Sequence, residues 1–166
     1  MREHLRTILV VAMLAATPLA MVGCETADSD QQMPASVERM NGIYRSIMRR
    51  PEHNAKRITV SHILIKKDGS EKHKGKDPAT AAAEVLEKAM SGEDYEKLQR
   101  INNDDSGTRY SMVADDVTPM GSDAKRSGMV PAVGDIGWRL KVGEVGIAIY
   151  DAKASNWGWH IIKRIE

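Results

Sequence analysis

The strongest structural signal in the chain is the segment RITVSHILIK, residues 57–66. Successive residues of a β-strand point to opposite faces of the sheet. One face would therefore carry Ile58, Val60, His62 and Leu64, and the other would carry Thr59, Ser61, Ile63 and Ile65. Because both faces are largely apolar, this pattern predicts a strand in the centre of a sheet, covered on both sides.

Helices are predicted before and after this strand. Residues 36–50 show apolar positions at helical spacing. Asp77 and Pro78 are typical of an N-cap and a first helical position, so a second helix is predicted from there to Gly92. A third helix is predicted over 93–102. The inward-facing residues would be Val37, Met40, Tyr44 and Ile47 in the first helix, and Tyr95, Leu98 and Ile101 in the third.

The C-terminal part of the chain contains shorter elements. The sequence predicts a short strand over 107–114, a loop over 115–127, a short helix over 130–140, and strands over 145–150 and 157–165. The helices and strands do not alternate regularly, as they would in a parallel α/β sheet. The order therefore predicts an α+β domain with an antiparallel sheet.

The first 24 residues differ from the rest of the chain. Arg2 and Arg6 precede an almost wholly apolar run over residues 8–20, which is typical of a secretory signal peptide and too short for an ordinary membrane span. The run ends in MVGC, residues 21–24, which resembles a bacterial lipobox with Cys24 as the site of lipid attachment. A plain signal peptide with an incidental cysteine is the alternative. Because Cys24 is the only cysteine, no intramolecular disulfide is possible.

These features predict three parts: a lipoprotein-type signal peptide over 1–23, a tether with a short helix over 24–56, and a folded domain over 57–166. The protein is expected to be exported to the cell envelope and held by its lipid at the periplasmic or extracytoplasmic face of a bacterial membrane. The formal net charge is only +1, so the composition indicates no nucleic-acid partner.

Two histidines, His62 and His160, lie in the most strand-like segments. Each could be a hydrogen-bonded core residue, a metal ligand or a base, and the two rings would meet if the first and last strands were neighbours. A metal site needs three or four convergent ligands, and His53 and His73 show no ligand spacing, so no metal is predicted. A hydrolase is not indicated either, because the chain has no G-x-S-x-G motif.

Three separated motifs resemble the parvulin, or rotamase, family of peptidyl-prolyl cis/trans isomerases. They are VSHILIK (60–66), LKVGEVG (140–146) and WGWHIIKRIE (157–166), and they occur in the family's order. The resemblance implies four antiparallel strands surrounded by helices. It also implies an enzyme that speeds rotation about X-Pro bonds in unfolded or flexible exported polypeptides, with no covalent intermediate and no cofactor.

The resemblance further implies which residues form the site. His62 and His160 match the family's two central histidines, and Asp105, with Asp104 as a close rival, matches a position held by Asp or Cys. The remaining residues implied are Met129, Val133 and Trp138 at the proline pocket and Ser155, a hydroxyl residue before the final strand.

The chain also departs from the family pattern. No G-G-D-L-G motif occurs between Ser106 and Gly128, and the chain has no phenylalanine, so Val133 stands where many parvulins carry that residue. Trp138 or Met120 would have to replace the missing aromatic ring. The alternative function is therefore a non-catalytic parvulin-fold module that binds peptides as a chaperone or scaffold.

Two surface features have an ordinary interpretation and a functional one. The loop over 66–76 carries five lysines, which indicate either a solvated loop or a preference for acidic residues before proline. Trp157 and Trp159 are interpreted as packing residues, with a ligand-binding platform as the alternative.

Overall fold

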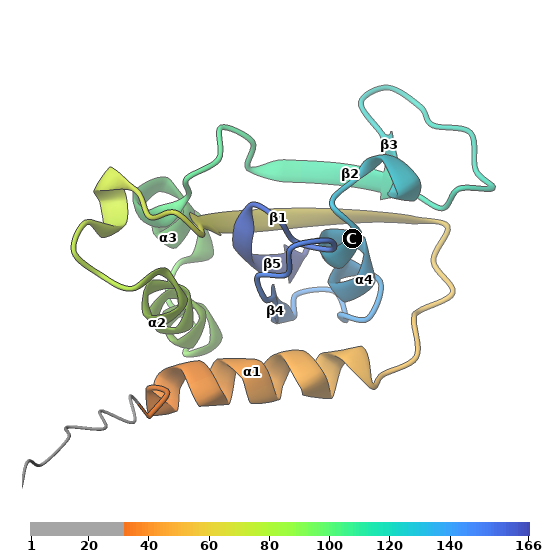
Figure 1. Cartoon of the computed structure of the whole chain (residues 1–166). Helices are drawn as coiled ribbons and strands as arrows, with labels where there is room; N and C mark the ends of the chain where they lie inside the picture. The colour runs from red at the N-terminus through yellow and green to blue at the C-terminus, as the bar shows by residue number, and fades with distance from the viewer. Residues whose placement is uncertain (1–31) are drawn as a thin grey trace, which may run out of the picture. The chain divides into compact units, whose positions relative to one another are not determined.

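A five-stranded sheet forms the centre of the domain (Figure 1). Its strands, in the spatial order β3-β2-β1-β5-β4, are β1 (Arg57–Lys66), β2 (Arg109–Val113), β3 (Ala124–Lys125), β4 (Val145–Ala148) and β5 (Gly158–Arg164). The strands β2, β1, β5 and β4 pair antiparallel, and the two-residue β3 pairs parallel with β2. The α+β prediction is confirmed, but the predicted four strands are corrected to five, because part of the expected 115–127 loop pairs with β2.

The computed structural model describes residues 32–166, which form one compact unit. The predicted signal peptide at 1–23, the lipid site at Cys24 and most of the predicted tether lie outside the described residues. The compact unit begins before residue 57, because α1 (Ala35–Met48) packs on α2 (Pro78–Met90) and β4. Within this described part, no helix is long and apolar enough to cross a membrane.

The prediction of a central strand at 57–66 is confirmed. β1 pairs with β5 along one edge and with β2 along the other. All of its residues from 58 to 65 are buried. Because pairing occupies both edges and packing covers both faces, β1 holds its side chains, His62 among them, at the centre of the fold.

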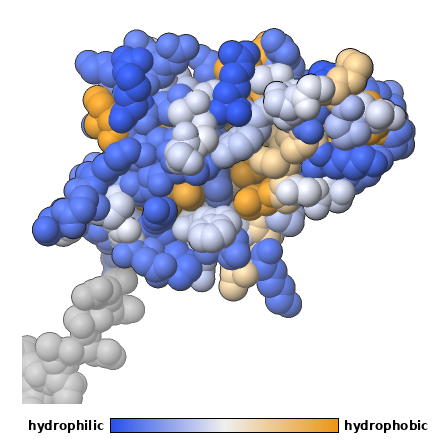
Figure 2. Space-filling view, turned by 90° about the horizontal axis from the view of Figure 1, so that it is seen from above, coloured by the Kyte–Doolittle hydropathy of each residue, from blue (hydrophilic) through white to orange (hydrophobic). Residues whose placement is uncertain are grey.

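Helices cover both faces of the sheet. On the face that carries Ile63 and Ile65, α1, α2 and α3 (Tyr95–Asn102) build the larger apolar core. On the face that carries Ile58 and Val60, α4 (Pro131–Gly137) closes a second apolar cluster, away from the α2–α3 pair in Figure 1. Seen from above, the surface is mainly hydrophilic, with apolar side chains gathered near its middle (Figure 2).

The helix signals at 77–92 are confirmed, but one predicted core residue of α3 is not. The Asp77 side chain accepts a hydrogen bond from the backbone N–H of Thr80 at 2.8 Å, and Pro78 is the first helical residue. Gly92 follows the end of α2 with φ of 93°, which favours glycine. Ile101, predicted inward, is 56% exposed, because the buried stripe of α3 runs through other positions: Tyr95, Leu98 and Gln99.

Candidate active site

The two strand histidines meet on one face of the sheet. β1 and β5 pair with Leu64 opposite His160 and His62 opposite Ile162, so the two histidines are diagonal neighbours. Their rings are nearly parallel, with centroids 5.5 Å apart, and the two Nδ1 atoms lie 3.3 Å apart. Both side chains are buried, at 2% and 3% exposure. The pairing of β1 with β5 is what brings them together.

Asp105, rather than Asp104, contacts the histidine pair. The Asp105 Oδ2 atom lies 3.2 Å from Nε2 of His62, and the backbone oxygen of Gly107 lies 3.1 Å from the same nitrogen. Asp104 instead accepts a hydrogen bond from the backbone N–H of Lys66 at 3.0 Å. The structure therefore resolves the one-residue ambiguity in the sequence in favour of Asp105.

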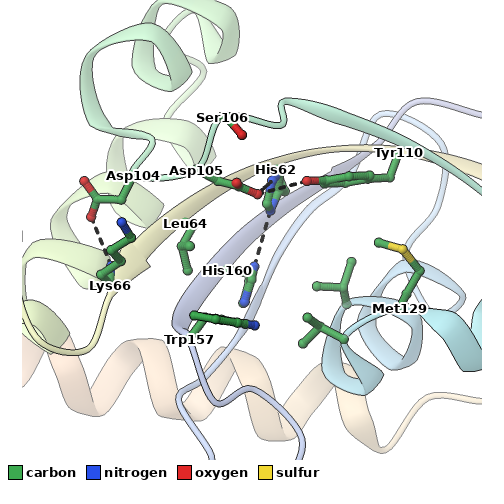
Figure 3. A pocket seen from close by; sticks show the side chains of 12 residues that line it. His62, Leu64, Lys66, Asp104, Asp105, Ser106, Tyr110, Met129, Trp157 and His160 are labelled. Carbon is green, nitrogen blue, oxygen red and sulfur yellow. Dashed lines mark hydrogen bonds and ion pairs between the residues drawn. The ribbon is translucent and has the colours of Figure 1, made fainter.

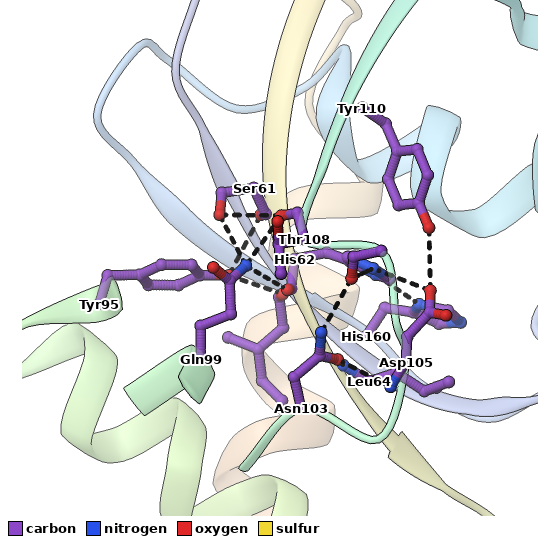
Figure 4. A network of polar contacts seen from close by, with 12 residues as sticks. Ser61, His62, Leu64, Tyr95, Gln99, Asn103, Asp105, Thr108, Tyr110 and His160 are labelled. Carbon is purple, nitrogen blue, oxygen red and sulfur yellow. Dashed lines mark hydrogen bonds and ion pairs between the residues drawn. The ribbon is translucent and has the colours of Figure 1, made fainter. Parts of the chain in front are cut away.

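Asn103 holds the loop that carries Asp105, a role that no sequence motif indicated. Its Oδ1 atom accepts from the backbone N–H of Leu64 at 2.8 Å and of Asp105 at 3.2 Å. Its Nδ2 group donates to the oxygen of Gly107 at 2.8 Å (Figure 4). Because Asn103 is only 4% exposed, these bonds are shielded from water and tie the loop firmly to β1.

Helix α3 supports the histidine strand from the opposite face. The Nε2 group of Gln99 lies 2.7 Å from the backbone oxygen of His62 and 2.8 Å from that of Thr108. The Tyr95 hydroxyl lies 2.8 Å from the backbone oxygen of Ile161 and 3.1 Å from that of Ser61 (Figure 4). These buried bonds hold β1, β5 and the start of β2 in a common register around the histidine pair.

The hydrogen-bond partners assign the histidine tautomers. Nε2 of His62 faces two oxygen acceptors, those of Asp105 and Gly107, so this nitrogen carries the proton. In a neutral ring the Nδ1 atom of His62 must then accept, and His160 donates from its own Nδ1. The remaining lone pair, on Nε2 of His160, is buried and has no partner within residues 32–166.

Tyr110 completes the polar network from β2. Its hydroxyl donates to Oδ2 of Asp105 at 2.9 Å, and its ring meets the His62 ring edge-on with centroids 4.9 Å apart. Gly107 makes room for it, because a Cβ atom there would lie 2.0 Å from the Tyr110 hydroxyl. The sequence offered no indication of Tyr110, since only the β1–β2 register, with Val60 opposite Tyr110, places it on the histidine face.

A pocket of about 570 Å³ opens above the histidine pair (Figure 3). Its walls combine apolar side chains, two aromatic residues and the acidic loop, and Tyr110 lies on the same side as Asp105 (Figure 3). Met129 lies across the pocket from Leu64 in Figure 3. The lining residues are His62, Leu64, Lys66, Asp104, Asp105, Ser106, Tyr110, Met129, Val130, Val133, Trp157 and His160.

The comparison with protein families matches this chain to one of them. A family described as the PPIC-type PPIASE domain (Rotamase_3) matches residues 42–166. The chain belongs to the PPIC-type peptidyl-prolyl isomerase family. Membership implies that the domain binds proline-containing peptides, and it confirms the resemblance to parvulins. No curated protein gave a significant match.

Burial keeps both histidines of this PPIC-type domain neutral at neutral pH. Burial lowers the pKa of His62, although the Asp105 charge and the oxygen of Gly107 oppose the change. Burial, followed by the neighbouring His62, lowers the pKa of His160 to about 4. Burial alone would raise the pKa of Asp105, but hydrogen bonds from Tyr110 and the nearby backbone hold it below its ordinary value. The Asp105–His62 contact is therefore a hydrogen bond from a neutral ring to a carboxylate.

These shifts predict that the domain loses stability on mild acidification. Between pH 6.5 and about 4 the unfolded chain protonates its histidines, whereas the folded chain keeps His160 neutral. Stability is thus fully present above pH 6.5 and falls as the pH decreases toward 4, by roughly 3 kcal/mol from His160 alone. Urea unfolding at a series of pH values measures this slope. A His160→Asn variant with the same pH slope as the unchanged protein would contradict the assignment.

Two predicted site residues of the domain do not line the pocket, which corrects their placement. Trp138 is 2% exposed, donates from its indole nitrogen to the backbone oxygen of Ala55 at 2.8 Å, and packs in the apolar cluster under α4. Ser155 is fully buried and donates to the backbone oxygen of Gly158 at 2.7 Å. Both side chains are engaged in holding the fold, so neither is free to contact a peptide.

The aromatic rings of the pocket come from Tyr110, which the sequence did not suggest, and from Trp157, for which a binding role was only the alternative interpretation. Met120, proposed as a replacement for the missing phenylalanine, is 67% exposed and lies outside the pocket, as Trp138 does. Tyr110 and Trp157 line it instead. The interpretation of Trp157 as a packing residue is wrong, since its side chain is 59% exposed. Met129 and Val133 do line the pocket, and their contact with proline stays a prediction.

Most of the lysines in the 66–76 loop already have partners. Lys67 pairs with Asp68 at 2.8 Å, Lys74 with Glu71 at 3.5 Å and Lys76 with Glu84 at 2.5 Å, and Lys72 donates to the oxygen of Asn103. Three of the five positive charges in this loop are therefore paired with a carboxylate of the described residues. In the described range, no group of three His, Cys, Asp or Glu side chains is arranged to hold a metal ion.

Proposed function

We propose that this domain catalyses cis/trans isomerisation of X-Pro bonds in exported proteins without a covalent intermediate. The observation that carries the proposal is the arrangement of an apolar wall, formed by Met129, Val130 and Val133, over a pair of neutral, hydrogen-bonded histidines. Such a pocket accepts a proline ring and offers the adjoining peptide carbonyl a weakly polar environment.

The chemistry of the reaction explains why such a pocket suffices. Rotation about an X-Pro bond has a barrier of about 18–20 kcal/mol, because the planar amide loses resonance when it twists. The twisted transition state has a less polar carbonyl than the planar ground state. An apolar pocket that excludes water therefore favours the transition state over the ground state, and only such differential binding accelerates a reaction.

The histidine network shapes the floor of this pocket. The hydrogen bonds of the pair run in one direction: His160 donates to His62, and His62 donates to Asp105. Burial keeps both rings neutral, and these bonds fix their orientation. Ser106 lines the pocket, but within the described residues neither ring is hydrogen-bonded to a serine or cysteine side chain. We therefore assign the network a positioning role and no role as a nucleophile.

The test is a prolyl-peptide isomerisation assay on the full chain in a non-ionic detergent. A rate above the uncatalysed one supports the proposal, and a rate equal to it contradicts the enzyme claim. For Met129→Ala we expect kcat/KM to fall about tenfold, since the apolar wall is truncated where the proline ring would bind. Met120→Ala is the matched control: its side chain is equally large but lies outside the pocket, so the rate should not change.

A second candidate function is a non-catalytic module that binds peptides as a chaperone or scaffold. It is favoured by one observation: Val133 is a smaller residue than the phenylalanine usual in the family, so the wall of the pocket is less bulky there. Val133→Phe separates the two candidates. A gain in kcat with unchanged folding supports an isomerase limited by its pocket, and peptide binding without any rate acceleration supports the binding module.

We also propose that the protein is exported and held at the membrane by a lipid on Cys24. The proposal rests on the basic and apolar segment over 1–20 and on the MVGC sequence at 21–24. Two-phase detergent partitioning of the bacterially expressed chain tests it. We expect the unchanged protein to enter the detergent phase. For Cys24→Ser we expect mass spectrometry to show no attached lipid, whether or not its signal peptide is cleaved. A lipid mass retained by Cys24→Ser contradicts the assignment.

A further inference from the structure

Trp157 is prominent in the pocket, although the histidine network makes no use of it. Its side chain is 59% exposed and lines the cavity together with Leu64 and Met129. In Figure 3 the ring lies beside His160, on the far side of the histidine pair from Asp105. A single exposed aromatic residue is common on protein surfaces, so its significance depends on how it is held and on what surrounds it.

The turn that carries Trp157 is fixed by its backbone. Ser155 donates from Oγ to the oxygen of Gly158 at 2.7 Å, which closes the turn around Trp157. The oxygen of Trp157 itself accepts from the backbone N–H of Lys67 at 3.0 Å. Gly158 lies so close to β1 that a Cβ atom there would be 2.0 Å from the oxygen of Ile65. These contacts fix the backbone that carries the ring, and the side chain lines the pocket.

The charged side chains that line this end of the pocket leave an excess of negative charge, because Asp105 is a carboxylate with neutral partners. Lys66 and Asp104 line it with one charge of each sign. Asp105 is occupied by Tyr110 and His62, and the histidine rings are neutral because burial lowers their pKa values. Electrostatics therefore gives little reason to select an acidic residue, and of the two aromatic residues that line the site, Trp157 is the more exposed.

We propose that Trp157 selects substrates that carry an apolar, and preferably aromatic, side chain next to the proline. This inference rests on the proposed isomerase function and names the substrate class of the same site. A tryptophan side chain on a fixed backbone has only two side-chain torsions to order when it stacks on a substrate side chain, and its face suits aromatic and aliphatic partners. Ser155 and Gly158 then act as positioning residues for Trp157.

Two peptide series test the selection on the full chain. In one series the residue before proline is Phe, Leu, Ala or Glu, and in the other the residue after proline varies in the same way. NMR exchange between the cis and trans forms gives kcat and KM for each peptide. We expect a preference of about tenfold for Phe over Ala in at least one series. Trp157→Ala should abolish this ratio by raising KM for the Phe peptide, and Trp157→Phe should retain most of it.

Tyr150→Ala is the matched control, because Tyr150 is a partly exposed aromatic residue that does not line the pocket. It should leave the ratio unchanged. Three outcomes overturn the inference: a Phe/Ala ratio that persists in Trp157→Ala, an equal loss of kcat/KM for all peptides in that variant, or a preference of the unchanged protein for Glu. If the unchanged protein accelerates no peptide, the isomerase proposal fails by itself. Dissociation constants for the same peptides then decide the inference, with the same Trp157-dependent ratio expected.

Discussion

Gly158→Ala is expected to destabilise the domain by on the order of 3–5 kcal/mol. Gly158 begins β5 with φ of 149°, and its backbone lies against the end of β1. An added Cβ atom would lie 2.0 Å from the oxygen of Ile65 and 2.9 Å from the nitrogen of Lys67. Both obstacles are backbone atoms, one in β1 and one in the residue that follows it, so relief requires β5 to move away from β1. Urea unfolding followed by circular dichroism measures the loss.

Gly42→Ala provides the control for this substitution. Gly42 lies inside α1, and a Cβ atom there would meet nothing within 4 Å. Because alanine favours helix more than glycine does, the variant should be more stable by about 0.5–1 kcal/mol. A Gly158→Ala protein that unfolds at the same urea concentration as the unchanged one would show that β5 can shift freely, and the tight β1–β5 contact would be wrong.

His62→Ala is expected to have the largest effect on activity, a loss of at least about tenfold in kcat/KM. The substitution removes the central member of the network, so Nδ1–H of His160 loses its acceptor and Asp105 loses a donor. Unpaired buried groups cost about 1–3 kcal/mol each, so stability should fall as well. The isomerisation assay and urea unfolding together separate the loss of activity from the loss of stability, because activity is measured at urea concentrations where the variant is still folded.

His53→Ala controls for the loss of a histidine as such. His53 lies in an exposed segment before β1 and outside the pocket. Its replacement should change neither stability nor kcat/KM measurably. If His62→Ala retained full activity while folded, the histidine pair would have no part in the reaction, and the pocket wall alone would have to account for any catalysis.

Much of the fold could be predicted because its signals are local. Three of these signals depend only on neighbouring residues, and the structure agrees with each. They are the two-residue alternation of β1, the Asp77–Pro78 start of α2 and the glycine after the end of α2. The prediction for α3 was less accurate. Its helical spacing is compatible with more than one apolar face, and packing against β1 selected the face that leaves Ile101 in solvent.

The candidate site was predictable only where a family motif marks it. His62, Asp105, His160, Met129 and Val133 line one pocket, as the resemblance implied. Trp138 and Ser155 do not, because both side chains have backbone hydrogen-bond partners that hold them in the fold. Spacing along the chain could not distinguish a residue that faces the pocket from one that lies behind it.

The central strand, the presence and approximate extent of the helices, the α+β class and the resemblance to the family could all be predicted from the sequence, because periodicity, caps and motifs are properties of short segments. Three-dimensional contacts were needed to show that Asp105 rather than Asp104 meets His62, and that Tyr110 and Trp157 supply the aromatic walls. The reason is strand register. A shift of one residue in the pairing of β1 with β2 or β5 turns every side chain to the other face, and register is set by contacts between residues far apart in the chain.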